Sequence, residues 1–192
     1  MGFLSKLLSS PTTKVVKTTA DRPHRISNPT IGFLNLQGAT GMALAHSDRS
    51  VLGPLFGQVR ESTSEVPRCE VLFIYCTIHP DGTVVGSLQP IREVIKKAGA
   101  YVAVLAAENS PEAYVKGMGQ KGDWFANIVM TIDRKGAKFS EFFARLFEAM
   151  FKRRSMLLTW VQLVPQIPGR DHPDAPSTIM AAEAGHLTFE RR

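Results

Sequence analysis

Four stretches of the chain are almost continuously apolar, and each ends at polar or glycine-containing residues. They span residues 30–36, 70–78, 101–107 and 127–132. Short, unbroken apolar runs are typical of strands that are buried on both faces, as in a parallel sheet. The pattern therefore predicts four strands of one mainly parallel sheet.

Helical periodicity occupies the segments between and after these runs. Residues 88–97 carry apolar side chains on one face and stop at Gly99. A second helix is expected to begin at Ser110, a capping residue, with Pro111 at the first helical position. The clearest helix is predicted over residues 138–153, where large apolar side chains recur every three or four positions: Phe139, Phe142, Phe143, Leu146, Phe147, Met150 and Phe151.

Strands that alternate with helices imply right-handed crossovers and a three-layer α/β sandwich around a mainly parallel sheet. Residues 30–192 are expected to form this single domain, after a basic, Ser/Thr-rich leader over residues 1–29. Residues 156–164 fit a helix or a strand. Beyond them we predict a proline-rich loop over residues 165–176, then a short helix and an edge strand within residues 178–189.

The composition is that of a folded domain, since 44% of the 192 residues are hydrophobic and 21% are charged. No apolar run approaches the roughly 20 residues that a transmembrane helix needs. The two cysteines, Cys69 and Cys76, are too few for a disulfide framework or a zinc site. We therefore expect a cytoplasmic protein with free thiols and no transmembrane segment.

The formal net charge of +6 lies partly near the termini and partly over residues 134–154. A modest basic excess permits acidic partners without requiring them. Base-stacking aromatic residues are not interleaved with these charges, which argues against nucleic-acid binding. Gly38 and Gly41 are not followed by the lysine of a phosphate-binding loop and match neither nucleotide fingerprint, so no cofactor is expected.

Polar residues follow each predicted strand. In open parallel sheets, ligands bind beyond the carboxyl ends of the strands, and these ends meet at one edge of the sheet. His79 and Glu108 are the candidate catalytic residues at this edge. The candidate ligand-binding residues are Gln37, Gly38, Gly41, Thr77, Asn109 and Asp133.

Each candidate also has a purely structural interpretation. An ordinary strand-to-loop turn explains residues 38–41, and His79 can be an exposed residue of the Pro-Asp-Gly turn that follows it. Glu108 can cap the helix at Ser110, and Asp133 can cap the long helix.

Other polar and thiol groups carry weaker signals. His46 with Asp48, and His172 with Asp174, are expected to be loop pairs without the third ligand that a metal site needs. Cys76 lies inside a predicted strand, so a packed thiol is the favoured interpretation.

The order of features from residue 70 to about 164 resembles the caspase-like fold of CHAT-type proteases. The segments that carry the resemblance are EVLFIYCTI, VLAAENS, and NIVMTID followed by KFSEFFARLFEAMF. In that family one strand ends in a catalytic His-Gly, the next ends at the nucleophilic Cys, and a third, with a trailing Asp, leads into a long aromatic-rich helix. The resemblance implies a caspase-like sandwich; a flavodoxin-like one fits the same pattern.

The catalytic dyad of that family is missing here. On the natural superposition Thr77 and Ile78 stand in place of the His-Gly, and Glu108 stands in place of the Cys. Neither threonine nor glutamate can replace a thiolate activated by an imidazole. The resemblance therefore implies a protease fold without the protease, a binding or assembly module whose ligand is a protein partner or a second copy.

Two other hypotheses compete with the module. The alternative is a small hydrolase of nucleoside or NAD type, in which Glu108 acts with His79 or Asn109 on a nucleotide-type ligand. A nucleotide or flavin binder that uses the edge at Gly38 and Gly41 ranks third because its glycines are few.

Overall fold

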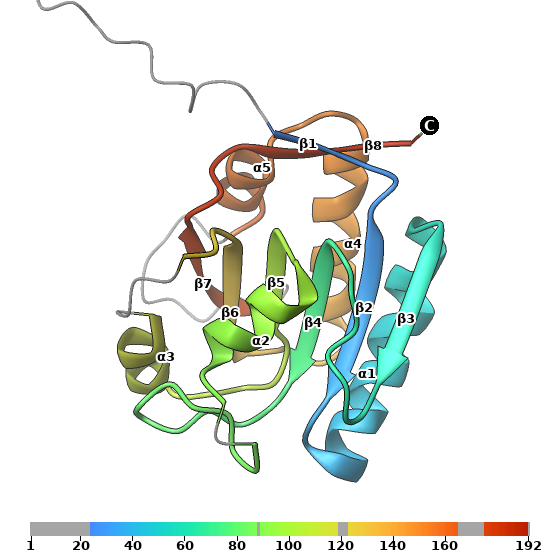
Figure 1. Ribbon diagram of the computed structural model, residues 1–192. Helices are drawn as coiled ribbons and strands as arrows, with labels where there is room; N and C mark the ends of the chain where they lie inside the picture. Colours follow the sequence, from blue (N-terminus) through green and yellow to red (C-terminus); the bar gives the residue numbers. More distant parts are fainter. Residues whose placement is uncertain (1–23, 88, 119–122, 165–174, 192) are drawn as a thin grey trace, which may run out of the picture.

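A six-stranded, mainly parallel sheet forms the centre of the protein, as the computed structural model shows for residues 24–87, 89–118, 123–164 and 175–191 (Figure 1). In spatial order its strands are β3 (Gln58–Ser62), β2 (Thr30–Asn35), β4 (Val71–Tyr75), β5 (Val102–Leu105), β6 (Asn127–Asp133) and β7 (Ser177–Ala182). All neighbours pair in parallel except β6 and β7, which are antiparallel. The four predicted strands and their parallel arrangement are confirmed.

If β2 is counted as the first strand along the chain, the strands β3, β2, β4, β5 and β6 have the spatial order 2-1-3-4-5 of a doubly wound sheet. In this topology the chain runs from β2 outward to β3 at one edge, and then crosses back past β2 to β4, β5 and β6 on the other side. The point of reversal lies between β2 and β4, which pair directly. A ligand site, if the sheet has one at the usual place, lies beyond the carboxyl ends of these two strands.

Helices cover both faces of the sheet and complete the predicted three layers. In Figure 1, α2 (Ile91–Ala98) and α3 (Pro111–Met118) lie in front of the sheet. The opposite face carries α1 (Gly38–Leu52), α4 (Lys138–Phe151) and α5 (Met156–Leu163).

Side chains of each central strand divide between the two layers. Phe73 of β4 packs in the cluster that includes α4, whereas its neighbours Leu72 and Ile74 pack in the cluster that includes α2. Successive side chains of this strand point to opposite faces of the sheet, and because both faces are buried, all of them are apolar.

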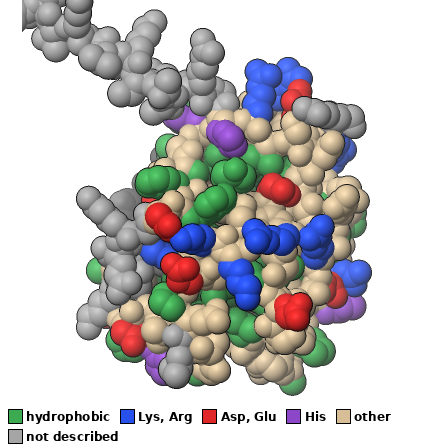
Figure 2. All heavy atoms as spheres, in the orientation of Figure 1, with side chains coloured by type: hydrophobic (Ala, Val, Ile, Leu, Met, Phe, Trp, Pro, Cys, Tyr) green, Lys and Arg blue, Asp and Glu red, His purple; other side chains and the backbone are tan. Residues whose placement is uncertain are grey.

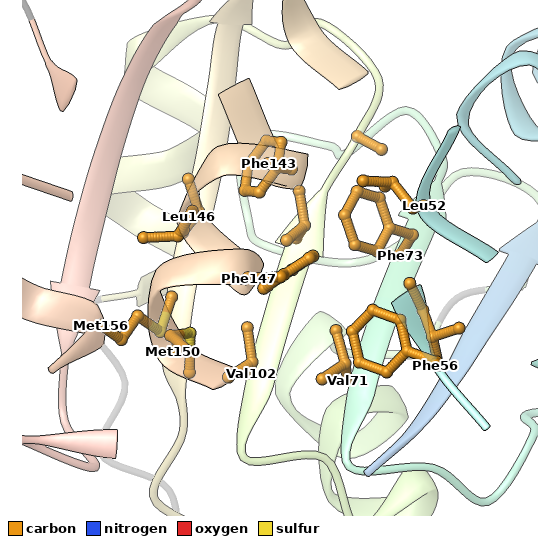
Figure 3. Close-up of a cluster of buried hydrophobic side chains, with 14 of the residues drawn as sticks. Leu52, Phe56, Val71, Phe73, Val102, Phe143, Leu146, Phe147, Met150 and Met156 are labelled. Carbon is orange, nitrogen blue, oxygen red and sulfur yellow. The ribbon is translucent and has the colours of Figure 1, made fainter. Parts of the chain in front are cut away.

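Helix α4 supplies the centre of the larger core. Its residues Phe143 and Phe147 are fully buried, and their ring centroids lie 5.3 and 6.1 Å from that of Phe73 on β4. Figure 3 shows these rings pointing toward one another between the helix and the sheet. Arg145 and Glu148 face outward, so the predicted division of α4 into a buried and an exposed face is confirmed.

Two elements between the first and second predicted strands were not predicted. Helix α1 occupies residues where a turn and a loop pair were expected, and it buries only Gly41, Asp48 and Leu52. Strand β3 is a polar edge strand, exposed along nearly its whole length. Neither segment carries the apolar pattern on which the prediction rests, because each packs against the protein along one narrow side.

The carboxyl-terminal segment also differs from expectation. Residues predicted to contain a short helix instead form β7 and a further strand, β8 (Leu187–Glu190). The prediction of a helix in this segment is wrong, because the segment pairs with β6 as strand β7 and completes the sheet. The ambiguous segment at 156–164 is helix α5, and the proline-rich loop falls largely outside the described residues.

Part of the predicted leader belongs to the folded body. Its residues His24–Ser27 form β1, which pairs in parallel with β8 and, in Figure 1, crosses the end of α4. Ile26 of β1 and Phe189 of β8 are buried against α4. Residues 1–23 of the leader lie outside the described part. Within that part, no helix combines the length and apolarity needed to cross a bilayer.

Candidate functional site

Gln37 and Thr77 meet at the carboxyl edge of the sheet, at the point of reversal. Gln37 follows β2 and Thr77 follows β4, and the Gln37 Nε2 donates a hydrogen bond of 2.9 Å to the Thr77 Oγ1. Both residues lie at the edge where the sequence predicts them. The bond spans the crevice in which doubly wound sheets usually bind ligands.

The glycines at this edge serve the turn from β2 into α1. The Asn35 side chain donates to the Gly38 carbonyl at 2.8 Å and accepts from the Gln37 amide at 3.0 Å. Gly38 has a φ of +64°, and a Cβ on Gly41 would lie 2.1 Å from the Asn35 Oδ1. Both glycines are therefore needed for local geometry, whether or not a phosphate is ever present.

Asn109 joins the loops that follow β4 and β5. Its Oδ1 accepts from the Ile78 amide at 2.8 Å, and its Nδ2 donates to the Cys76 carbonyl at 3.1 Å. The Tyr114 hydroxyl from α3 lies 3.3 Å from the same Nδ2 and donates to the Thr131 carbonyl at 2.9 Å. Tyr114 was not among the predicted residues, although its position four after the Ser110 cap places it on the inner face of α3.

Glu108 and His79, the candidate catalytic pair, are both exposed. The Glu108 Oε1 accepts from the Arg134 backbone amide at 2.9 Å, so it fastens the loop after β6 and does not cap α3. His79 lies in a turn in which its amide donates to the Thr83 carbonyl. In the described part of the chain, no hydrogen bond or ion pair joins the two side chains.

Asp133 bonds to Lys135, two residues further along the chain. Its carboxylate accepts from the Lys135 amide at 3.0 Å and pairs with the Lys135 ammonium at 2.7 Å. The hydrogen bond from Lys135 lowers the pKa of the Asp133 carboxyl. Asp133 does not cap α4, because the residue at the cap position is Ala137 and no side chain bonds to the first turn.

A buried ionic cluster lies beneath this edge, and the sequence pattern does not predict it. Asp48 was expected in a loop, but it lies on α1 with its carboxylate fully buried. It accepts from the Tyr75 hydroxyl at 2.7 Å and from Arg134 Nη2 at 2.8 and 3.0 Å, and it also accepts from the Ser140 hydroxyl. Burial and the nearby Asp48 charge raise the pKa of Tyr75.

The cluster joins several elements of the fold through hydrogen bonds and a ring contact. The Arg134 guanidinium also donates to the Ala106 carbonyl and stacks 3.7 Å above the Phe139 ring centroid. It thereby links α1, β4, the loop after β5, and α4. The signal that could have identified Asp48 is its place four residues before the buried Leu52, on the inner stripe of α1.

The cysteines occupy apolar positions in the layer that carries α2. Both Cys69 and Cys76 are free, as predicted, and the predicted burial of Cys76 is confirmed; Cys69 is buried as well. Burial raises the pKa of each thiol to about 12. Among the described residues, no three His, Cys, Asp or Glu side chains are grouped so that they could hold a metal ion. His172 and Asp174, the second expected loop pair, lie outside that part of the chain.

The native protein is expected to react slowly with a thiol reagent at neutral pH, because both thiols are protonated and shielded from solvent. Absorbance with a chromogenic disulfide should show no fast phase in native buffer and two thiols per chain after denaturation. Rapid modification of Cys76 in the native state would contradict the packing described here.

Neither Glu108 nor His79 lines any of three cavities that are formed by described residues. One of about 280 Å³ lies between α1 and β3 and is lined in part by Asn35, His46 and Glu61. The other two, of about 380 and 550 Å³, adjoin each other at the opposite, amino edge of the sheet. Of these three cavities, the two larger ones lie away from the carboxyl-edge residues, and the smallest adjoins the ends of β2 and β3.

Comparisons with protein-family models, with curated proteins and with solved structures gave no match for this chain.

Proposed function

We propose that this chain is a non-catalytic α/β module that binds a protein partner or a second copy of itself. The observation that carries the proposal is that polar side chains at the carboxyl edge form hydrogen bonds with one another and with the neighbouring backbone. Gln37 bonds to Thr77 across the point of reversal, and Asn109 joins two adjacent loops. A polar group that already has internal partners offers little to a substrate unless those bonds are first broken.

The residues at the positions of the missing dyad support the same proposal. If the chain has a caspase-like form, Thr77 and Glu108 occupy the places of the histidine and the cysteine. Thr77 accepts from Gln37, and Glu108 holds the Arg134 amide. The thiol of Cys76, whose pKa is raised to about 12 by burial, is a poor nucleophile at neutral pH.

The hydrolase hypothesis requires Glu108 to act on a nucleotide-type substrate. Changing Glu108 to Gln keeps the side-chain oxygen that accepts from Arg134 but removes the charge. We therefore expect Glu108→Gln to change the free energy of unfolding by no more than about 1 kcal/mol. We also expect that neither the wild-type protein nor Glu108→Gln hydrolyses nucleosides or NAD, and chromatography of the products measures this.

The matched control is Glu112→Gln, which removes an exposed carboxylate from the first turn of α3. Turnover that is lost in Glu108→Gln and kept in Glu112→Gln would establish the hydrolase and refute the module. Cleavage of a peptide panel that is blocked by alkylating cysteine would refute both.

A further inference from the structure

Strand β3 forms one edge of the central sheet and is exposed along nearly its whole length. It pairs in parallel with β2 on one side, and in Figure 1 no described helix or strand of the sheet lies beyond it. In a parallel pair, alternate residues of each strand turn their N–H and C=O groups away from the partner strand. Strand β3 therefore presents backbone donors and acceptors along an open edge, which a further strand can extend.

The side chains of β3 divide between the two faces of the sheet. Val59 is the register partner of Ile31, which belongs to the core shared with α4. A Cβ on Gly53, just after α1, would lie 3.6 Å from the Val59 Cγ2, so Val59 lies on the α1 side. Val59 is nonetheless 36% exposed. Gln58 and Arg60, its neighbours in the strand, point to the opposite face.

The charges near this edge are of both signs. In Figure 2, blue, red and green side chains occur together along the right-hand margin of the molecule, where β3 lies in Figure 1. Glu61 pairs with Arg49 of α1 at 2.5 Å. Among the described residues, Arg60 has no side-chain hydrogen bond or ion pair. A surface with both signs favours neither a polyanion nor a polycation, but it can be complementary to a copy of itself.

The sequence of β3 limits how two copies of this strand can pair. Two copies that pair antiparallel are related by a two-fold axis. Opposite residues of an antiparallel pair have their side chains on the same face, so the axis passes beside the same residue of both copies. An axis at Arg60 would place two guanidinium groups opposite each other, and an axis at Glu61 would place two carboxylates there. Like charges directly opposite each other destabilise a strand pair, so both registers are unfavourable.

An axis at Val59 places no like charges opposite each other. Val59 then faces Val59 of the second copy, and β-branched side chains pack well across paired strands. Arg60 faces Gln58 of the second copy. The Gln58 side-chain oxygen accepts a long bond of 3.3 Å from the Thr30 hydroxyl, and it has a second lone pair for the guanidinium. This register therefore gives Arg60 a hydrogen-bond partner.

The same register leaves room for the Glu61 side chain. Glu61 faces Gly57 of the second copy, and a Cβ on Gly57 would have no atom of the described residues within 4 Å. Glu61 thus keeps its ion pair with Arg49 of its own chain. Charged side chains on an edge strand usually discourage pairing. Here they disfavour the registers centred on Arg60 and Glu61 and permit the one centred on Val59.

We propose that two copies of this chain associate through β3, antiparallel and with the two-fold axis at Val59, so that their sheets form one continuous sheet. Backbone hydrogen bonds along the edge supply the affinity, and the side-chain pairs set the register. The strand is short, so we expect a weak dimer with a Kd on the order of 10 µM. This inference rests on the proposed binding function and names the second copy as the partner.

An extended segment of a different protein is the alternative occupant of this edge. Such a segment would use the same backbone groups of β3. The second copy is favoured because its own β3 supplies a valine opposite Val59, an amide opposite Arg60 and a glycine opposite Glu61. The alternative predicts that the wild-type chain alone is a monomer.

Disulfide trapping locates the axis. Val59→Cys places two thiols opposite each other, with Cα atoms about 4.5–5.5 Å apart, as a disulfide requires. We expect a disulfide-linked dimer after mild oxidation, as seen by non-reducing gel electrophoresis, because Cys69 and Cys76 are buried and should stay reduced. The matched control is Glu61→Cys, whose two thiols would lie about 13 Å apart along the strands and cannot be bridged.

Sedimentation velocity of the full chain measures the dimer without a cross-link. Val59→Glu places two carboxylates at the axis and should raise the Kd at least about tenfold. The matched control is Val85→Glu, because Val85 is 39% exposed between β4 and α2 and receives the same charge. It should leave the Kd unchanged. Both substitutions lie on the surface, so circular dichroism should show the wild-type fold in each variant.

The interface is overturned if the wild-type chain remains a monomer up to about 300 µM. It is also overturned if Glu61→Cys forms a linked dimer as readily as Val59→Cys. Equal dimerisation of Val59→Glu and wild type, or equal weakening by Val59→Glu and Val85→Glu, has the same meaning.

The remaining outcomes separate the interface from the proposed function. A monomeric chain without turnover overturns the interface alone and leaves the binding function to a different partner. Turnover that depends on Glu108, in a chain that dimerises through Val59, overturns the non-catalytic function and supports the interface.

Discussion

Replacing Phe143 with alanine is expected to lower the free energy of unfolding by about 3–5 kcal/mol. Phe143 is fully buried, and its ring lies 4.8 Å from Phe139, 5.3 Å from Phe73 and 5.9 Å from Phe147, measured between centroids. Truncation therefore leaves a cavity among rings that belong to both α4 and the sheet. Urea denaturation followed by circular dichroism measures the loss.

The matched control for this variant is Phe125→Ala. Phe125 is 63% exposed, so the same truncation opens no cavity there and should change stability by no more than about 0.5 kcal/mol. Equal effects at the two positions would mean that α4 does not pack on the sheet as described.

Replacing Asp48 with alanine is expected to cost a similar amount, about 3–5 kcal/mol, for a different reason. The change leaves the Arg134 guanidinium buried without its carboxylate and removes the acceptor of the Tyr75 and Ser140 hydroxyls. A buried charge without a partner keeps its desolvation penalty and loses the compensating attraction. Urea denaturation at neutral pH gives the value.

Asp123→Ala provides the comparison for an exposed ion pair. Asp123 pairs with Lys96 at 2.6 Å, but its side chain is 72% exposed. Surface pairs contribute little, so we expect a change below about 1 kcal/mol. A loss at Asp48 as small as that at Asp123 would contradict the buried, fully bonded state of the Asp48 cluster.

The elements that could be predicted are those whose burial is complete or regularly periodic. Strand β4 was predicted because all five of its residues are buried, and α4 because one face is lined with phenylalanine. Helix α1 and strand β3 escaped prediction because both are largely exposed and offer no long apolar stripe. Tertiary pairing, more than local sequence pattern, forms these two elements.

The sequence predicts the location of the candidate site but not the hydrogen bonds within it. Gln37, Thr77 and Asn109 lie at the expected edge because the carboxyl ends of parallel strands converge. That Gln37 bonds to Thr77, and Asn109 to the loop after β4, depends on the registers of β2, β4 and β5, which a single sequence does not specify. Asp48 and Arg134 are 86 residues apart, and only the fold brings them together.

The central claim is that the carboxyl edge of the sheet is held closed by its own side chains, and amide hydrogen exchange tests it most directly. The Ile78 amide donates to the Asn109 Oδ1, and the Arg134 amide donates to the Glu108 Oε1. We predict that both amides exchange at least about 100-fold more slowly than in an unstructured peptide. In Asn109→Ala the protection of Ile78 should fall while that of Arg134 persists. Exchange of the wild-type Ile78 amide at the rate of an unstructured peptide would mean that the edge is open, and would contradict the account.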